Sequence, residues 1–406
     1  MRSHILIGLV ALASSVVPMA ARAQLSDGIV KIGVINDQSG MYEDITGAKS
    51  VAAVKLAIQD FGGTVLGKPI ELIVADHQNK PDVATAIVRQ WIDTKQVDAV
   101  ADTTGSGIAL ALQELTRTAN RTLLIASSAT SDLTGKNCSE TGTQWSYDTY
   151  ALAKGTARGI TLQGGDTWFI IAADYAFGHA MQRDATLFIE QNGGKVLGTV
   201  RAPLGSADYS SFLLQAQASK AKIVGFATAS SDTITAVKQA GEFGLVAKGQ
   251  KLGGLLVFIN DVEALGLQAA QGLMLTTSFY WDLNDETRAW TKRFWEKAGN
   301  TKAPNMLQAG LYAATLHYLK AVEAAGTDEA KAVAAKMREL RVNDFYNKDV
   351  EVRADGRVMH KMYLVEVKSP AESKYKFDYY KLIAEIAPQD AFRPISEGGC
   401  PLIAKK

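Results

Sequence analysis

From residue 29 onward, short runs of β-branched and other apolar residues alternate with longer segments in which apolar residues recur every three or four positions. The first run, 29–35, has the composition of a strand, and the segment 46–60 places Val51, Val54 and Ile58 on one face of a helix. The same two patterns continue as strands over 71–75, 98–101 and 122–126 and as helices over 81–95 and 108–120. Repeated β–α units of this length predict a mostly parallel, doubly wound sheet.

A second series of the same kind begins near Thr167. It predicts strands over 168–172, 222–227 and 252–259 and helices over 178–191 and 232–241. Between the two series lies an irregular stretch, 137–151, which we expect to carry the chain from one sheet to the other. The chain is therefore predicted to have an α/β fold with two doubly wound parallel-sheet lobes.

The last part of the chain has a different pattern. Its periodic segments predict helices over 286–298, 304–325 and 329–340, which we expect to return the chain to the first lobe. Asp355 and Gly356 then separate two strand-like runs, 350–353 and 358–367, as in a β-hairpin. The expected first lobe comprises residues 24–147 with 279–355, and the expected second lobe comprises 148–278 with 356–406, ending in the hairpin and a tail.

The first 23 residues have the pattern of a secretory signal peptide. Arg2 supplies the positive start, 5–17 is apolar, and the small residues Ala21 and Ala23 suit a cleavage site. The apolar run is shorter than the roughly 20 residues of a membrane-spanning helix. We expect cleavage near Ala23 and export of the mature chain, with an uncleaved anchor as the alternative.

Charge excludes one class of partner. Loss of Arg2 and Arg22 with the signal peptide lowers the formal charge of +1 by two, so the mature chain is almost neutral. Such a surface has no electrostatic preference for nucleic acid or anionic lipid. We expect a monomer without a nucleic-acid partner.

Cys138 and Cys400 are the cysteines of the chain. An even pair in an exported protein most often forms a structural disulfide, which here would tie the middle of the chain to its C-terminus. Two free thiols are the alternative. Neither cysteine has a ligand-spaced partner and the histidines are scattered, so we expect no metal site and no cofactor.

Small hydroxyl residues follow the strands of the first series. Ligands of open parallel sheets bind at the carboxyl ends of the strands, and the first N–H groups of a following helix favour an anion. A carboxylate can be held there by neutral donors; the alternative is that these residues cap helices. The candidate ligand-binding residues of this wall are Ser39, Tyr42, Thr104, Ser106, Ser128, Ala129 and Thr130.

The corresponding loops of the second series supply aromatic rings. Rings form apolar pocket walls with little rotamer entropy to lose, although an aromatic residue at a strand end also often packs in the core. Phe258 belongs to this group of rings. The candidate residues of this second wall are Tyr175, Phe177, Ser230, Asn260, Asp261, Tyr280 and Trp281, together with Tyr150 from the irregular stretch.

Several of these stretches carry a resemblance to a known family. They are Ile32-Gly33-Val34 with Ser39-Gly40, Leu66-Gly67-Lys68-Pro69-Ile70, Ser128-Ala129-Thr130 with Leu133-Thr134, Asp174-Tyr175-Ala176-Phe177-Gly178, and Asp208-Tyr209-Ser210-Ser211-Phe212. In them the chain resembles the periplasmic solute-binding proteins of ABC transporters, of the leucine/isoleucine/valine-binding type (type I). The resemblance implies two lobes joined by a multi-strand hinge, a ligand bound between them, and delivery of that ligand to a membrane permease from the periplasm. It also implies that loops 104–106 and 128–130 hold a carboxylate.

One departure from the family changes the expected ligand. Amino-acid-binding members hold the ammonium group with an acidic side chain near the position of Ile259, where this chain is apolar. The resemblance therefore implies a carboxylate with an aromatic or hydrophobic body. A branched-chain or hydrophobic amino acid, or an amide, is the alternative, with Asp261 as the clamp.

An exported hydrolase is the competing class. The chain has no Gly-x-Ser-x-Gly or His-Glu-x-x-His motif and no phosphate-binding loop, so we expect a binding protein and not an enzyme. A sensor that reports its ligand to a separate receptor is a further alternative.

Overall fold

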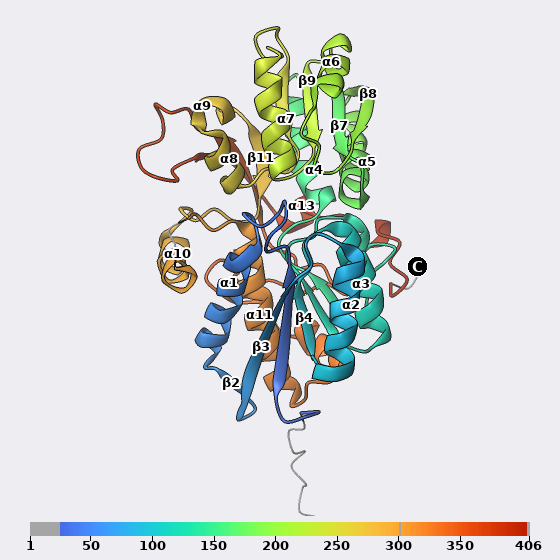
Figure 1. Cartoon of the computed structure of the whole chain (residues 1–406), viewed down its shortest axis with the longest axis vertical. Coiled ribbons are helices and arrows are strands. Elements are labelled where there is room, and N and C mark those ends of the chain that lie inside the picture. The colour runs from blue at the N-terminus through green and yellow to red at the C-terminus, as the bar shows by residue number, and fades with distance from the viewer. Residues whose placement is uncertain (1–24, 300–301, 404–406) are drawn as a thin grey trace, which may run out of the picture.

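The computed structural model describes residues 25–299 and 302–403, which form two α/β lobes arranged end to end (Figure 1). The expected signal peptide, 1–23, lies outside the described residues. Within the described ranges, no helix has both the length and the apolar character that a membrane crossing requires.

The first lobe is built on a sheet with the strand order β2-β3-β1-β4-β5-β6. Neighbouring strands are parallel, except that β2 pairs antiparallel with β3. The strands are β1 (Val30–Asn36), β2 (Thr64–Val65), β3 (Lys68–Asp76), β4 (Ala99–Asp102), β5 (Thr122–Ile125) and β6 (Gly142–Gln144). Gly33 in β1 is required for close packing, because a Cβ there would lie 2.5 Å from the ring of Trp91.

Helices cover both faces of this sheet (Figure 1). They are α1 (Gly47–Phe61), α2 (Pro81–Gln90) with the π-helical turn η1 (Trp91–Lys95), α3 (Ser106–Thr118), α10 (Asp285–Ala298), α11 (Met306–Ala325) and α12 (Ala330–Glu339), with the 3-10 turn η2 (Ser131–Thr134) after β5. The late helix α11 packs against α1 and α12, so the chain does return to the first lobe.

The second lobe is built on a parallel sheet with the order β10-β9-β7-β8. Its elements are α4 (Thr149–Leu162), β7 (Thr167–Ala173), α5 (Ala176–Gln191), β8 (Lys195–Ala202), α6 (Ser210–Ala218), β9 (Ile223–Ala227), α7 (Ser231–Glu242), β10 (Lys251–Gly254), α8 (Ile259–Leu265) and α9 (Leu267–Ala270). The two parallel sheets confirm the predicted fold class.

The strand expected over 252–259 is too long. The sheet strand ends at Gly254, and helix α8 begins at Ile259. The apolar residues between them are buried in an irregular segment, where burial and not strand pairing accounts for their hydrophobicity.

The expected hairpin around Gly356 is also wrong in its extent. One antiparallel bridge, Val352 with Val358, spans the turn, and Arg357 then bridges to Gln144 at the end of β6. The following strand pairs elsewhere, in a small antiparallel sheet of β11 (Met274–Thr277), β12 (Met362–Val367) and β13 (Tyr380–Ile386).

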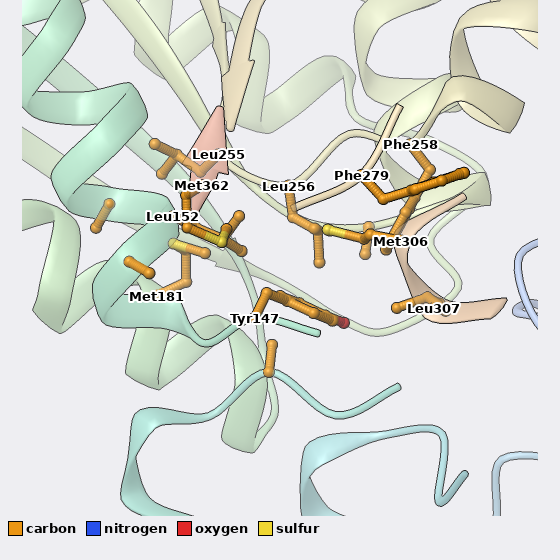
Figure 2. Close-up of a cluster of buried hydrophobic side chains, with 14 of the residues drawn as sticks. Tyr147, Leu152, Met181, Leu255, Leu256, Phe258, Phe279, Met306, Leu307 and Met362 are labelled. Carbon is orange, nitrogen blue, oxygen red and sulfur yellow. The ribbon is translucent and has the colours of Figure 1, made fainter. Parts of the chain in front are cut away.

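An apolar cluster is continuous between the lobes (Figure 2). Met306 and Leu307 of α11 belong to it from the first lobe, and Met181 of α5 belongs to it from the second. Tyr147, which lies between β6 and α4, is a member as well. Rings and aliphatic side chains therefore fill the junction around which the lobes meet.

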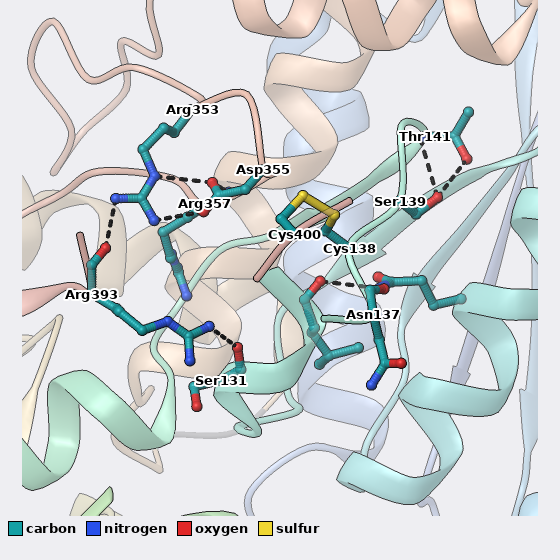
Figure 3. Close-up of a disulfide and its surroundings, with 12 residues drawn as sticks. Ser131, Asn137, Cys138, Ser139, Thr141, Arg353, Asp355, Arg357, Arg393 and Cys400 are labelled. Carbon is teal, nitrogen blue, oxygen red and sulfur yellow. Dashed lines mark hydrogen bonds and ion pairs between the residues drawn. A yellow bond between two sulfur atoms is a disulfide. The ribbon is translucent and has the colours of Figure 1, made fainter. Parts of the chain in front are cut away.

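The expected disulfide is present: Cys138 and Cys400 are bonded, with 5.5 Å between their Cα atoms (Figure 3). The tail contains α13 (Pro388–Ala391) and η3 (Ile395–Glu397). Helix α13 packs on α4 of the second lobe, whereas Arg393 Nη2 donates to Ser131 O, 2.7 Å away in the first lobe. The tail, placed in the second lobe by the expected boundaries, thus ends against the first.

Candidate ligand-binding site

A pocket lies between the lobes, where the carboxyl ends of both parallel sheets face each other. Its lining residues are Tyr42, Ile45, Thr104, Gly105, Ser106, Ser127, Ala129, Tyr147, Tyr175, Phe177, Ala229, Leu256 and Phe258. Among the described residues, those that line it include no acid, lysine, arginine or histidine. Its contacts with a ligand are therefore hydrogen bonds and apolar contacts.

The first lobe supplies a polar wall at the start of α3. Gly105 precedes the helix at φ +95°, and the described residues place no side-chain cap on its first turn. Thr104 Oγ1 is buried and has no hydrogen-bond partner among the described residues. Ser106 Oγ accepts from Thr130 N at 3.1 Å, which leaves its own proton to donate. Free N–H groups at a helix start beside hydroxyl donors form an anion-binding wall.

Aromatic rings form the remaining walls. Tyr147 and Phe258 are in edge-to-face contact, with 6.3 Å between ring centroids, and Tyr175 lies 5.8 Å from Phe177. Tyr42 is oriented by a hydrogen bond from its backbone N–H to Asp37 Oδ2 at 2.9 Å. Its hydroxyl is 2.6 Å from that of Tyr175, so the two lobes touch across the pocket. Burial raises the pKa of both tyrosines, which keeps these hydroxyls neutral.

Further contacts join the lobes beside the pocket. Ser131 Oγ of the first lobe donates to Asp184 Oδ2 of α5 at 2.8 Å. Asn305 Nδ2 of the first lobe donates to Asn260 Oδ1 of the second at 2.8 Å. Ser230 Oγ of the second lobe donates to Met41 O of the first at 3.1 Å. The free volume of the pocket is about 20 Å³, the space of roughly one water molecule. A larger ligand therefore enters only when these contacts open.

The structure brings part of the expected first wall to the pocket. Tyr42, Thr104, Ser106 and Ala129 line it. Ser39 is exposed and bonds to Asp76, outside the pocket. The two remaining candidates, Ser128 and Thr130, do not line it: Ser128 Oγ donates to Thr103 O, and Thr130 Oγ1 accepts from Asp132 N at 3.3 Å. For Thr130 the capping alternative is the observed one.

From the second wall, Tyr175, Phe177 and Phe258 line the pocket. Tyr280 and Trp281 do not, because the Tyr280 hydroxyl and Trp281 Nε1 both donate to Phe377 O at 3.0 Å and hold these rings in the second lobe's own core. Tyr150 packs against Phe188 in the apolar cluster, with 4.8 Å between centroids.

The polar candidates of the second wall lie at the contact between lobes, not in the pocket. Asn260 and Ser230 make the cross-lobe hydrogen bonds given above. Asp261 Oδ2 accepts from Phe258 N at 2.9 Å and caps the start of α8. Asp261 is not among the described lining residues of the pocket, and its role toward an ammonium group stays a prediction.

Six lining residues were absent from the sequence-based candidates: Ile45, Gly105, Ser127, Tyr147, Ala229 and Leu256. Gly105, Ser127 and Ala229 are neighbours of predicted residues in the same loops, so their position after a strand was the available signal. Tyr147 lies in the irregular stretch that was expected to cross between lobes, and its aromatic character was the available signal. Ile45 and Leu256 carry no such signal, because apolar residues beside a helix start are ordinary core residues.

The buried carboxyl of Asp261 predicts how the stability of the protein depends on pH. Burial raises the pKa of its carboxyl to about 7, whereas an unfolded aspartate titrates near about 3.9. Between these values the folded protein binds a proton that the unfolded chain has released, so stability falls as pH rises from about 4 to about 7. Asp261→Asn keeps an oxygen for Phe258 N and removes this titration. We expect the variant to match the wild type at pH 4 and to exceed it at pH 8 by at most about 4 kcal/mol, measured by urea denaturation, since each pKa unit corresponds to about 1.36 kcal/mol.

Asp98 supplies the matched comparison. Burial raises its pKa to about 7 as well, and it lies in the first lobe, where its Oδ2 accepts from Lys31 N. The Asp261→Asn variant should therefore retain part of the pH dependence, and Asp98→Asn should remove a further part. Equal stability of Asp261→Asn and the wild type at pH 8 would show that the pKa of Asp261 is not raised in the folded protein.

Two parallel-sheet lobes with a shared pocket at their facing strand ends define a protein that encloses a ligand by lobe closure. In the described part of the chain, His, Cys, Asp and Glu side chains do not gather into a group that could hold a metal ion. The chain belongs to the periplasmic binding protein family, whose family model matches residues 29–374, and it has the type I fold of that family. Membership implies an exported protein of the periplasm.

Solved structures agree with this assignment. The chain is 45% identical to a periplasmic binding protein from Burkholderia mallei, with a TM-score of 0.90 over 93% of this chain and 99% of that one. It is 40% identical to a branched chain amino acid ABC transporter periplasmic ligand-binding protein from Burkholderia xenovorans LB400, with a TM-score of 0.81 over 92% and 99%. A solute-binding protein from Rhodopseudomonas palustris, in complex with benzoate, shares the fold at 20% identity, with a TM-score of 0.80 over 92% and 100%.

Proposed function

We propose that this protein is the solute-binding receptor of an ABC uptake transporter and that its ligand is a small carboxylate with an aromatic or hydrophobic body. The chemistry of the pocket carries the proposal. The uncapped start of α3 and the hydroxyls of Thr104 and Ser106 suit a carboxylate, and the rings opposite suit an apolar body. We also propose cleavage of the signal peptide near Ala23, a monomeric receptor that does not transform its ligand, and delivery of that ligand to a membrane permease.

Binding couples to closure of the lobes. In the open form the carboxylate docks on the α3 wall, and closure brings Tyr175 and Phe177 of the second lobe onto the apolar body. Because both lobes then contact the ligand, occupancy raises the population of the closed form. The ligand also separates the hydroxyls of Tyr42 and Tyr175, which are otherwise in contact.

An α-amino acid is the second candidate, since the Burkholderia xenovorans relative is named as a branched chain amino acid transporter component. A buried ammonium group without a counter-charge costs several kcal/mol. The described lining residues include no acid, and Asp261 is engaged by Phe258 N. These two observations favour a carboxylate that carries no ammonium group.

A ligand screen tests the proposal. Benzoate, 4-hydroxybenzoate, leucine and benzamide are added to the mature protein, and the midpoint of thermal unfolding is followed. A ligand at about 100 times its Kd adds about 2.7 kcal/mol of apparent stability. We expect stabilisation by a benzoate and none by benzamide, whose amide lacks the charge. Stabilisation by leucine alone would replace the proposed ligand class with the amino acid.

Removing the two hydroxyls of the polar wall tests the carboxylate site. Thr104→Val and Ser106→Ala each delete a donor with little change of volume. Together they should weaken carboxylate binding by at least about 3 kcal/mol, because hydrogen bonds to charged groups are worth about 1.5–3 kcal/mol each. Titration calorimetry with the carboxylate found in the screen measures the change.

Thr130→Ala is the matched control, because Thr130 Oγ1 caps η2 and does not line the pocket. The control should bind as the wild type does while losing some stability. Full affinity in the Thr104/Ser106 double variant, or a loss confined to the Thr130 variant, would place the carboxylate elsewhere.

A further inference from the structure

A second and larger cavity lies in the second lobe. It is a groove of about 930 Å³, within the roughly 300–1,000 Å³ of small-molecule sites. Residues at the amino ends of β9, β10 and β11 line it, including Ile223, Leu252 and Met274. Because the pocket between the lobes lies at the carboxyl ends of the parallel strands, the groove lies at the opposite end of the second lobe's sheet.

The floor of the groove is apolar and contains several glycines. Its apolar residues are Ile160, Ile223, Val237, Val246, Leu252, Leu273 and Met274, and its glycines are Gly164, Gly165, Gly241, Gly249 and Gly272. Gly241 lies in the last turn of α7, and a Cβ there would meet no atom within 4 Å. A side chain placed at Gly241 would therefore extend into the open space of the groove.

The rim of the groove is basic. Lys222, Lys238 and Lys251 line it, and the one carboxylate among its described lining residues is Glu366. Lys222 is paired with Asp166 at 2.8 Å. The ammonium groups of Lys238 and Lys251 make no hydrogen bond or ion pair with the described residues. Two cations without partners beside an apolar floor complement a molecule that has an apolar chain and an anionic head.

We propose that this groove binds a single-chain amphiphile with an anionic head group, of the class of a medium-chain carboxylate. The chain lies along the floor between α7 and the segment that follows α9, and the head group meets Lys238 and Lys251. The site is independent of the pocket between the lobes, because the two share no lining residue.

Titration calorimetry with decanoate, below its micellar concentration, tests the proposal on the mature protein. We expect saturable binding of one decanoate in the groove. Gly241→Trp fills the groove and should weaken this binding about ten-fold or more, whereas Gly241→Ala, the matched control, should leave it unchanged. Lys238→Gln with Lys251→Gln should weaken it by about five-fold or more, and decanol should bind more weakly than decanoate.

Further measurements separate this site from the pocket between the lobes. The Thr104→Val/Ser106→Ala variant should bind decanoate in the groove as the wild type does. Decanoate binding in the groove is therefore tested independently of the carboxylate site between the lobes. Circular dichroism shows whether Gly241→Trp is folded; the lysine variants give an independent answer if it is not. Absence of saturable decanoate binding, equal binding by Gly241→Trp, or binding only to vesicles of anionic phospholipid would each overturn the proposal.

Discussion

Replacing Cys138 and Cys400 by serine is expected to lower the free energy of unfolding by about 5 kcal/mol, the largest change among the substitutions considered. The two cysteines are separated by 262 positions, so their bond closes a very long loop in the unfolded chain. The entropy that a disulfide removes from the unfolded state grows with the logarithm of loop length. The bond also fixes the tail whose Phe392 ring packs on Arg357 and whose Arg393 donates to Ser131 O.

Guanidinium denaturation followed by circular dichroism measures this loss. Reduced wild-type protein is the control and should unfold at the same denaturant concentration as the double serine variant. Reducing agent should leave the double variant unchanged. Both cysteines lie outside the pocket, so the folded variant should retain its ligand affinity. A denaturation midpoint equal to that of the oxidised wild type would show that the bond contributes nothing.

The loops that form the polar wall were predictable from the sequence for a topological reason. A parallel sheet places all its strand carboxyl ends at one edge, so residues that follow strands are brought together whatever the details of packing. Tyr42, Thr104, Ser106 and Ala129 follow strands of the first series and meet in the pocket. This reasoning requires only that the strands are parallel, which the repeated β–α units indicate.

Whether an aromatic residue at a strand end lines the pocket or packs in the core could not be predicted in the same way. Tyr280 and Trp281 have the same local pattern as Tyr175 and Phe177, but their polar atoms meet Phe377 O, about 100 positions along the chain. Such a long-range partner leaves no mark near the residue itself. Asp261 is similar: the capping of its own helix, and not the ligand, uses its carboxylate.

The segment after Gly356 shows a second limit. Strand propensity and the Asp-Gly turn predicted a hairpin, and the turn does form. The register then follows from tertiary contacts: β12 pairs with β11 and β13, and Arg357 is drawn to the end of β6. A buried arginine at this crossing could not be foreseen from a pattern that ranks arginine as a surface residue.

Arg357 is fully buried where the segments between the lobes pass one another. Its Nη2 donates to Trp145 O at 2.6 Å and its Nη1 to Tyr147 O at 2.9 Å (Figure 3 shows the side chain). Asp148 Oδ2 lies 3.6 Å from Nη1, and the Phe392 ring lies 4.4 Å from the guanidinium carbon. Burial lowers the pKa of Arg357 to about 10, so the group stays charged at neutral pH.

Arg357→Met is therefore expected to lower the free energy of unfolding by about 3–5 kcal/mol, since it leaves Asp148 as a buried charge without this counter-charge. It also removes the guanidinium donors to the carbonyls of Trp145, Tyr147 and Val358. Arg357→Lys should lose less, because one ammonium keeps the charge but cannot reproduce the planar fork between Trp145 O and Tyr147 O. Asp148→Asn, added to Arg357→Met, removes the uncompensated charge and should restore part of the loss. Urea denaturation of the four proteins, including the wild type, measures these differences. Two results would contradict this account: a loss of less than about 1 kcal/mol of unfolding free energy in Arg357→Met, or a larger loss when Asp148→Asn is added. Either would show that the Arg357–Asp148 charge pair does not stabilise the crossing segments.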